Sequence, residues 1–493
     1  MNLTPLFRRH ISFDKAVLSR AALYSVLLLL AAHAFCFFNL TYSSGSVMLH
    51  VASGRNVQIA AGAYLQPVYW HIRGSISSPL FVGMLSILYL TACSAIIACL
   101  LRITQRPALF ALCAVMGVNA AVLSICAGSL HTADASFLAL LLCTVACALC
   151  MRVRFGVLPG TLMLTAALAL DSSCCAYFAA LMLIAALSDL LISGDIRGFL
   201  ADAASLLGAL ITGVAIYLLG YALMLRRSGF DRQIRLLFFG GDLLQAYTAS
   251  MRALFAPLTA HPLLNTLLRI LFALACIGAL MHCARTKGRR ITLLLAASLL
   301  LFPLLSGLTF LSGQERIQIT AAHCLADVLV IMLACRLFSR KARVLKAMSA
   351  AFALLTLGGI VFSNQVYLKK NLEFESTLSV MSRVIARVEA VEGYQPGYTP
   401  VAIIGTPESS VLSVQRKGFE HLSALDAAGA NYAIASDTDM TWYAWEVMGY
   451  PLNFVSTFEL EQLKESAEVQ ALPAFPQDSC CQFIGDTLVI RIS

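Results

Sequence analysis

Residues 79–101 read PLFVGMLSILYLTACSAIIACLL and include no charged side chain. A helix rises about 1.5 Å per residue, so a run of this length can cross the roughly 30 Å hydrocarbon core of a bilayer. Apolar residues follow one another here instead of alternating with polar ones, which favours a helix over a strand of a membrane barrel. The stretch therefore predicts a membrane-spanning helix.

Ten further apolar stretches lie on both sides of this run. They are 20–38, 108–128, 136–151, 157–171, 174–192, 200–224, 263–283, 291–312, 319–338 and 344–363, and 157–171 is short for a crossing. The whole chain is 59% hydrophobic and 12% charged, with a mean hydropathy of +0.80. A soluble domain could not bury that much apolar surface, so we predict an α-helical polytopic membrane protein with about eleven transmembrane helices.

Basic residues mark every second connection between these stretches. They are Arg8, Arg9, Lys15, Arg20, Arg102, Arg106, Arg152, Arg154, Arg197 and the basic residues of 285–290 and 340–343. Cytoplasmic loops carry an excess of Lys and Arg, so these connections are expected inside, with the N-terminus inside and the C-terminus outside. The net charge of +9 comes largely from these short loops and does not indicate nucleic-acid binding.

The two ends of the membrane part have distinct characters. The first apolar run is long for a signal peptide and no small-x-small cleavage motif follows it, so we expect a retained anchor. After about residue 363 the composition becomes that of a soluble protein, with helical spacing over 372–391 and strand-like runs at 401–405, 432–435 and 488–492. We predict a transmembrane domain at 1–363 and a small extracytoplasmic α/β domain at 364–493.

The first outer loop, 39–78, combines aromatic and basic residues, among them Arg55, Tyr69, Trp70 and Arg73. Such a mixture is typical of interfacial helices and of sugar-binding clefts, while an aromatic belt with snorkelling arginines explains it equally well. No paired C-x-x-C motifs indicate zinc, and the D-x-D pattern at Asp437–Asp439 lies in the soluble tail. We therefore expect no cofactor and leave a divalent metal ion open.

Several short motifs, in order along nearly the full chain, resemble the serotype-converting O-antigen glucosyltransferases of bacteria and their phages. The motifs are Ser53-Gly54-Arg55, Ser77-Ser78-Pro79-Leu80, His131-Thr132-Ala133-Asp134-Ala135, Ser312-Gly313-Gln314-Glu315-Arg316, Leu472-Pro473-Ala474-Phe475-Pro476 and the closing residues 486–491. The resemblance implies a GT-C-like hexosyltransferase of the bacterial cytoplasmic membrane. Such an enzyme moves a sugar, usually glucose, from a polyprenyl-phosphate carrier to a cell-surface glycan on the outer face.

An inverting sugar transfer needs a carboxylate that accepts the proton of the acceptor hydroxyl. The family carries an acidic residue in the first outer loop, whereas 39–78 contains neither Asp nor Glu, and the tyrosine-glutamine pair expected around 171–177 is also missing. The candidate bases are Asp134, Glu315 and Asp171. Each has a structural alternative, namely an N-cap for Asp134, an exposed ion pair with Arg316 for Glu315 and a turn for Asp171.

A guanidinium can donate hydrogen bonds to two oxygens of the leaving phosphate at once. The predicted phosphate-binding residues are therefore Arg55, Arg316 and Arg269. His131, Tyr69 and Trp70 complete the predicted substrate-binding residues. In the stretch 319–338, His323 and Asp327 lie four residues apart and share a helix face. They are expected to line a carrier groove or relay protons, or to form an interhelical hydrogen-bonded pair.

Two other classes of function remain open. A lipid-linked glycan flippase or transporter would need charged groups through the bilayer depth and often two related halves, whereas the ionisable residues here concentrate toward the outer face and no internal duplication is visible. A catalytically inactive scaffold of a surface-polymer assembly is the third class, which the absence of acids in the first outer loop favours.

The charge pattern makes a direct prediction of topology. A reporter fused after Ser493 that is active only in the cytoplasm should be inactive, because the tail is expected outside. Reporter activity in whole cells is the measurement. An active reporter would show that the predicted number of crossings is wrong by an odd number.

Overall fold

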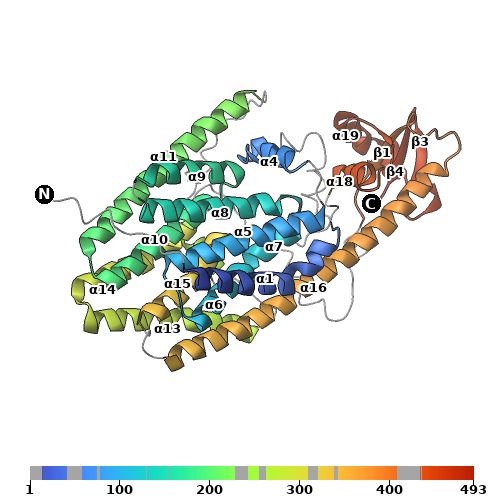
Figure 1. Cartoon of the computed structure of the whole chain (residues 1–493). Coiled ribbons are helices and arrows are strands. Elements are labelled where there is room, and N and C mark those ends of the chain that lie inside the picture. The colour runs from blue at the N-terminus through green and yellow to red at the C-terminus, as the bar shows by residue number, and fades with distance from the viewer. Residues whose placement is uncertain are drawn as a thin grey trace. The chain divides into compact units, whose positions relative to one another are not determined.

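The structure is a computed structural model that describes residues 14–41, 58–74, 78–128, 130–153, 155–227, 243–254, 262–308, 320–337, 342–407, 434 and 436–493. The chain divides into two compact units. The first is a bundle of helices that ends at Asn364, and the second consists mainly of Gln365–Ser493 and contains all the strands found among the described residues (Figure 1).

Each of the eleven predicted stretches corresponds to helical structure in the described chain. The helices are α1 (Lys15–Phe38), α5 (Pro79–Leu100), α6 (Arg106–Gly117) with α7 (Ala120–Gly128), α8 (Leu130–Arg152), α9 (Val157–Leu170), α10 (Cys174–Ser193), α11 (Ile196–Arg227), α13 (Pro262–Thr286), α14 (Arg289–Ser306), α15 (Ala321–Leu337) and the first part of α16 (Ala342–Glu389). Among the described residues, nine helices are long and apolar enough to cross a membrane. The prediction of a helical polytopic membrane protein is confirmed.

The two remaining apolar helices are shorter. α9 has 14 residues and α15 has 17. α15 is nevertheless buried along almost its whole length, because it packs against α6, α10 and α13. Two further helices, α4 (Gln66–Ile72) and α12 (Leu243–Leu254), lie outside the predicted apolar stretches.

The stretch predicted as one helix at 108–128 is interrupted between α6 and α7. Val118 leaves helical geometry with φ −114° and ψ 81°. The Asn119 side chain donates to the Val115 and Met116 carbonyls at 2.9 and 3.2 Å and accepts from the Val122 N–H at 2.9 Å, so one amide caps both halves. Hydrocarbon offers no hydrogen bonds, so a break in a membrane helix requires such internal partners.

The break has a further partner on α1. The buried His33 side chain donates from Nε2 to the Gly117 carbonyl at 2.9 Å. A backbone acceptor freed by the end of α6 is therefore bound by a neighbouring helix. The interruption is a built element of the bundle, with every named polar group in it hydrogen-bonded.

Two buried ion pairs lie near opposite ends of α8. Near its C-terminus, Arg152 Nη1 contacts Asp189 of α10 at 2.6 Å, and Arg152 Nη2 donates to the Leu100 carbonyl at the end of α5 at 2.9 Å. Near its N-terminus, Asp134 pairs with Arg73. The two positions on α8 are about 27 Å apart at 1.5 Å per residue, close to the thickness of the hydrocarbon core.

The C-terminal unit contains a four-stranded sheet in the order β2 (Asn453–Phe454), β1 (Pro400–Ile404), β4 (Thr487–Arg491), β3 (Cys481–Ile484). β1 runs parallel to both β2 and β4, and β3 runs antiparallel to β4. The predicted strands at 401–405 and 488–492 correspond to β1 and β4, while 432–435 falls mostly outside the described residues. β2 and β3 were not predicted.

The second half of α16 covers this sheet. Met381, Val384 and Val388 of α16 are buried in one apolar cluster with Val401 of β1 and Leu488 of β4. The sequence predicted a membrane helix at 344–363 and a separate helix at 372–391, whereas the structure has one helix of 48 residues. No proline interrupts the residues that join the two predicted helices, so nothing in the backbone ends the first one. The remaining helices described in this unit are α18 (Asp437–Trp442), a π-helix (Tyr443–Val447), α19 (Thr457–Glu465), α20 (Ala467–Ala471) and a 3-10 helix (Asp478–Cys480).

The Arg152–Asp189 pair predicts a large effect on stability. Asp189→Ala leaves a buried arginine without its carboxylate and should destabilise the bundle by about 3–5 kcal/mol. The double variant Arg152→Met, Asp189→Leu removes both charges and should recover most of that loss. Thermal stability of the detergent-solubilised protein is the measurement, with the exposed Arg197→Ala as control. A double variant less stable than Asp189→Ala would contradict this account.

Candidate functional site

The candidate site is built on α4, a helix of seven residues in the described part of the segment between α1 and α5. Pro67 stands in its first turn, where a missing N–H does no harm. The Leu65 N–H donates to the Ala169 carbonyl at 2.9 Å, and Gln66 Nε2 donates to the Leu170 carbonyl at 2.9 Å. α4 is thereby anchored to the C-terminal end of α9.

Asp134 of α8 is the centre of a buried polar network. Its side chain is fully buried, and Arg73 Nη1 lies 2.6 and 2.7 Å from its two carboxylate oxygens. The Tyr69 hydroxyl donates to Oδ2 at 2.9 Å, and Tyr89 of α5 lies 3.3 Å from the Tyr69 oxygen. Arg73 Nη1 also donates to the His131 carbonyl at 3.2 Å.

The spacing of the sequence explains this geometry. Tyr69 and Arg73 are four residues apart and therefore face the same way from α4. The Arg73 guanidinium lies 6.0 Å from the Tyr69 ring centroid, within range of a cation–π contact. Asp134 lies in the second turn of α8, near the positive end of the helix dipole.

The structure corrects one alternative for Asp134. An N-cap residue precedes its helix, but α8 begins at Leu130, four residues earlier, and both Asp134 oxygens are bound by side chains of α4. Asp134 is therefore not an N-cap. The competing roles that remain are a structural ion pair and a catalytic carboxylate.

Tyr69 is a neutral donor in this network. Burial raises the pKa of the Tyr69 phenol well above its ordinary value, and the hydrogen bond with Tyr89 and the Asp134 charge raise it further. The phenol therefore keeps its proton at neutral pH and donates it in the hydrogen bond to Asp134. Such a hydrogen bond to a charged acceptor is stronger than one between neutral groups.

Two buried polar atoms on α4 lack a hydrogen-bond partner in the described part of the chain. They are the indole N–H of Trp70 and the amide oxygen of Gln66. The two residues are four apart and share a face of α4. Buried polar groups are nearly always satisfied, so this donor and this acceptor are positioned to bind water or a polar ligand.

The other predicted site residues do not join this network. Glu315, Arg316 and Arg55 lie outside the described residues. Asp171 follows α9 and accepts from the Ser173 N–H at 3.0 Å, as a turn residue does. Arg269 is exposed in the second turn of α13.

The His323 and Asp327 side chains do not bond to each other. His323 Nδ1 accepts from the Thr320 N–H at 3.1 Å, one turn before it. Asp327 is 8% exposed, and no hydrogen bond or ion pair joins it to another residue of the described chain. Cys324, between them in sequence, contacts the Asn119 side chain at 3.1 Å, which places this turn of α15 beside the α6–α7 break.

The acidic pair of the tail has a structural role. Asp439 accepts from the Ser436 N–H at 3.0 Å and completes a capping box of α18, while Asp437 pairs with Lys464 at 2.6 Å. Within the described residues, no three His, Cys, Asp or Glu side chains gather in a way that could hold a metal ion.

Sequence reasoning missed the partners of Asp134. Arg73 was recognised only as one polar residue of the loop, and Tyr89 was hidden in the apolar run that decides the fold. The sequence did contain a sign that Arg73 pairs with a distant acid. Arg73 lies four residues after Tyr69, in a loop that has no acidic residue to pair with it. A cation in such a position must find its carboxylate elsewhere in the fold.

Comparison of the chain with known proteins gives no match among family profiles, curated proteins or solved structures. The fold defines the chain as a helical polytopic membrane protein, and the Asp134 network is its candidate site.

The network predicts unequal roles for its two tyrosines. Tyr69→Phe removes a hydrogen bond to a charged acceptor and should lower stability by about 1.5–3 kcal/mol, whereas Tyr89→Phe removes a longer bond between neutral hydroxyls worth about 0.5–1.5 kcal/mol. Thermal denaturation of both purified variants in the same detergent is the measurement. Equal losses would show that the Tyr69–Asp134 bond contributes no more than the Tyr69–Tyr89 contact.

Proposed function

We propose that the chain is a membrane glycosyltransferase that moves a hexose, glucose by the family resemblance, from a polyprenyl-phosphate carrier to a cell-surface glycan. The proposal places the reaction on the outer face of a bacterial cytoplasmic membrane, with eleven crossings, the N-terminus inside and the tail outside. The observation that carries it is the meeting of Asp134, Arg73 and Tyr69 at one end of α8.

These groups supply what the transfer needs. As the acceptor hydroxyl attacks the anomeric carbon, Asp134 accepts its proton, and the bond from that carbon to the carrier phosphate breaks. Charge then develops on the leaving phosphate, where a guanidinium offers forked donors. Arg73 fills this role among the described residues, and Arg55 and Arg316 remain candidates for the same role.

In the structure Arg73 and Asp134 are paired with each other. In the proposed mechanism this arrangement is the site before the donor binds. A donor phosphate is a better partner for a guanidinium than a carboxylate is in charge and in number of oxygens. Phosphate binding to Arg73 would free the Asp134 carboxylate when the donor is present. The unpaired Trp70 N–H and Gln66 oxygen on α4 are suited to sugar hydroxyls.

A flippase or transporter of a lipid-linked glycan is the second candidate, and Asp327 is the observation in its favour. A nearly buried carboxyl without a described partner inside an apolar helix marks a functional position by default. Comparing membranes with and without the protein separates the two candidates. A hexose difference in the surface glycan supports transfer, and unchanged glycan with a changed distribution of lipid carrier supports the flippase.

The catalytic role of Asp134 makes a quantitative prediction. Asp134→Asn should lower transfer per folded protein by about 10²- to 10⁴-fold, the usual contribution of a general base. Asp195→Asn, the same change at an exposed acid, should leave transfer unchanged. Glycan mass measured against the amount of monodisperse protein is the readout.

A double variant separates catalysis from folding. Arg73→Gln, Asp134→Asn removes both charges, so no buried charge is left unpaired. If the pair were only structural, this variant would transfer normally once folded, and the proposed roles would be wrong. If Asp134→Asn transfers normally and Glu315→Gln does not, the base is Glu315.

A further inference from the structure

A cluster of arginines joins four helices of the bundle, α5, α8, α10 and α15, near their C-terminal ends. The Arg152 guanidinium at the end of α8 contacts both oxygens of Asp189 on α10, at 2.6 and 3.1 Å. It also donates to the Leu100 carbonyl at the end of α5 at 2.9 Å. Arg152 and Asp189 therefore neutralise each other.

Arg336, the last residue but one of α15, has only neutral partners. Its Nε donates to the Ser188 hydroxyl of α10 at 3.1 Å. Its Nη2 donates to the same hydroxyl at 3.0 Å and to the Leu101 carbonyl. No ion pair joins Arg336 to another residue in the described part of the chain, and its side chain is partly exposed. Its charge is therefore not compensated by a carboxylate of its own.

Arg102 stands where glycine is usual. α5 ends in a Schellman motif, in which the Ile103 N–H donates to the Ala98 carbonyl at 2.8 Å and the Arg102 N–H donates to the Cys99 carbonyl at 3.1 Å. The motif requires a positive φ at Arg102, here 48°, which strains any residue that has a Cβ atom. A strained residue that persists suggests a use for its side chain, and the Arg102 side chain is exposed.

The cluster carries an excess of positive charge. Arg102 and Arg152 are the cations, and Asp189 the acid, whose charges act most strongly on Arg336. Three guanidiniums and one carboxylate leave two positive charges in excess. The negative ends of the helix dipoles offset part of this excess. An anion bound between Arg102 and Arg336 would offset the rest.

We propose that Arg102 and Arg336 bind the phosphate of an anionic phospholipid at this end of the bundle. A guanidinium can donate to two phosphate oxygens at once, and its planar fork matches their spacing. This lipid site is separate from the Asp134 network and does not depend on sugar transfer.

The residues that follow Arg152 favour a lipid over a soluble anion. Val153, Phe155 and Leu158 are 47%, 75% and 72% exposed. α5 and α8 have 22 and 23 residues, and helices of this length end near the headgroups of a bilayer. A phospholipid can place its phosphate on the arginines and its acyl chains against such apolar side chains, whereas a free phosphate leaves them uncovered.

The charges favour an anionic headgroup over a zwitterionic one. Both oxygens of Asp189 are bound by Arg152, so an ammonium group would meet the cations of the cluster without a free carboxylate to pair with. The pattern of basic loops predicts that this end faces the cytoplasm. Basic pockets between membrane helices on that side are suited to anionic headgroups.

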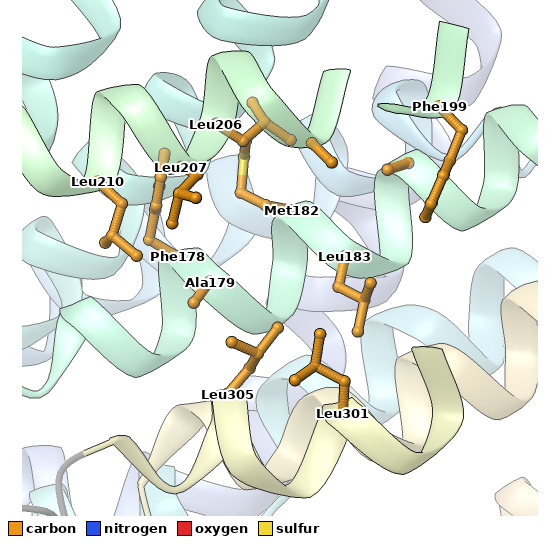
Figure 2. A pocket seen from close by; sticks show the side chains of 12 residues that line it. Phe178, Ala179, Met182, Leu183, Phe199, Leu206, Leu207, Leu210, Leu301 and Leu305 are labelled. Atoms are coloured by element: carbon orange, nitrogen blue, oxygen red, sulfur yellow. The ribbon is translucent and has the colours of Figure 1, made fainter. Parts of the chain in front are cut away.

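The apolar groove among α10, α11 and α14 offers no comparable selectivity (Figure 2). All twelve residues that line it are Ala, Leu, Met or Phe, so none of them can bind a phosphate. A lipid chain in that groove would be held whatever its headgroup. Selection by headgroup is therefore expected from the arginine cluster.

Lipid titration of the purified full-length protein tests the inference. Native mass spectrometry of the detergent-solubilised protein should show saturable binding of phosphatidylglycerol. Phosphatidylethanolamine with the same acyl chains should bind about tenfold more weakly, because its ammonium group is repelled by the cluster. Glycerol phosphate at the same concentration should not displace phosphatidylglycerol, since it lacks the acyl chains.

Arg102→Gly separates lipid binding from folding. Glycine is the preferred residue at this positive φ, so the variant should unfold at the same temperature as the parent or higher. It loses one guanidinium and should bind phosphatidylglycerol about tenfold more weakly. Arg336→Gln should weaken binding similarly, with its thermal stability measured in parallel because Arg336 also caps α5. Arg197→Gln, which removes an exposed arginine at the start of α11, should bind as the parent does.

Any of four results would overturn the inference. The first two are equal binding of phosphatidylethanolamine and displacement of the lipid by glycerol phosphate. The third is undiminished binding of phosphatidylglycerol by folded Arg102→Gly. The fourth is an equal loss in Arg197→Gln, which would show that general positive charge and not the cluster attracts the lipid.

Discussion

The cost of placing charge in a low-dielectric interior is the constraint on which this molecule depends. A carboxylate or guanidinium taken out of water must find an opposite charge and further hydrogen bonds, or the fold loses several kcal/mol. α8 carries one such charge near each end, Asp134 and Arg152. Their partners, on α4 and α10, are thereby held in fixed positions against α8. The ion pair at the N-terminal end also brings a carboxylate and a cation together at one end of α8.

The Asp134–Arg73 ion pair is suited both to stabilising the fold and to a role in a reaction. The hydrogen bonding of the neighbouring groups bears on which role applies. A purely structural pair has all its hydrogen-bonding capacity used by the protein. Both Asp134 oxygens are bound, whereas the neighbouring Trp70 and Gln66 each keep one buried polar atom without a partner in the described chain. Such atoms are costly unless something else binds them. Gln66, Tyr69, Trp70 and Arg73 follow one another at helical spacing, so satisfied and unsatisfied polar groups lie on the same face of this short segment.

The sequence predicted the elements that depend on one dominant physical effect. It did not predict the features that depend on contacts between residues distant in the chain. Uninterrupted apolar runs determine helices in a membrane, so every predicted stretch corresponds to helical structure. The break at Val118 could not be read locally, because Asn119 and the distant His33 provide the hydrogen bonds that allow it. Asp134 was recognised, but its partner Arg73 lies 61 residues away. In the tail, β1 and β4 have strong apolar patterns, whereas the two-residue β2 exists only through its pairing with β1.

The interrupted helix has a consequence for how the protein enters the membrane. α6 and α7 have 12 and 9 residues, so each alone rises less than about 20 Å and is too short to be inserted as a spanning segment. The two must leave the insertion machinery as one continuous apolar segment. α1 is synthesised earlier, so His33 is already in the bilayer when the Gly117 carbonyl arrives. The contact that accommodates the bend therefore joins a segment synthesised early, α1, to one synthesised later, α6.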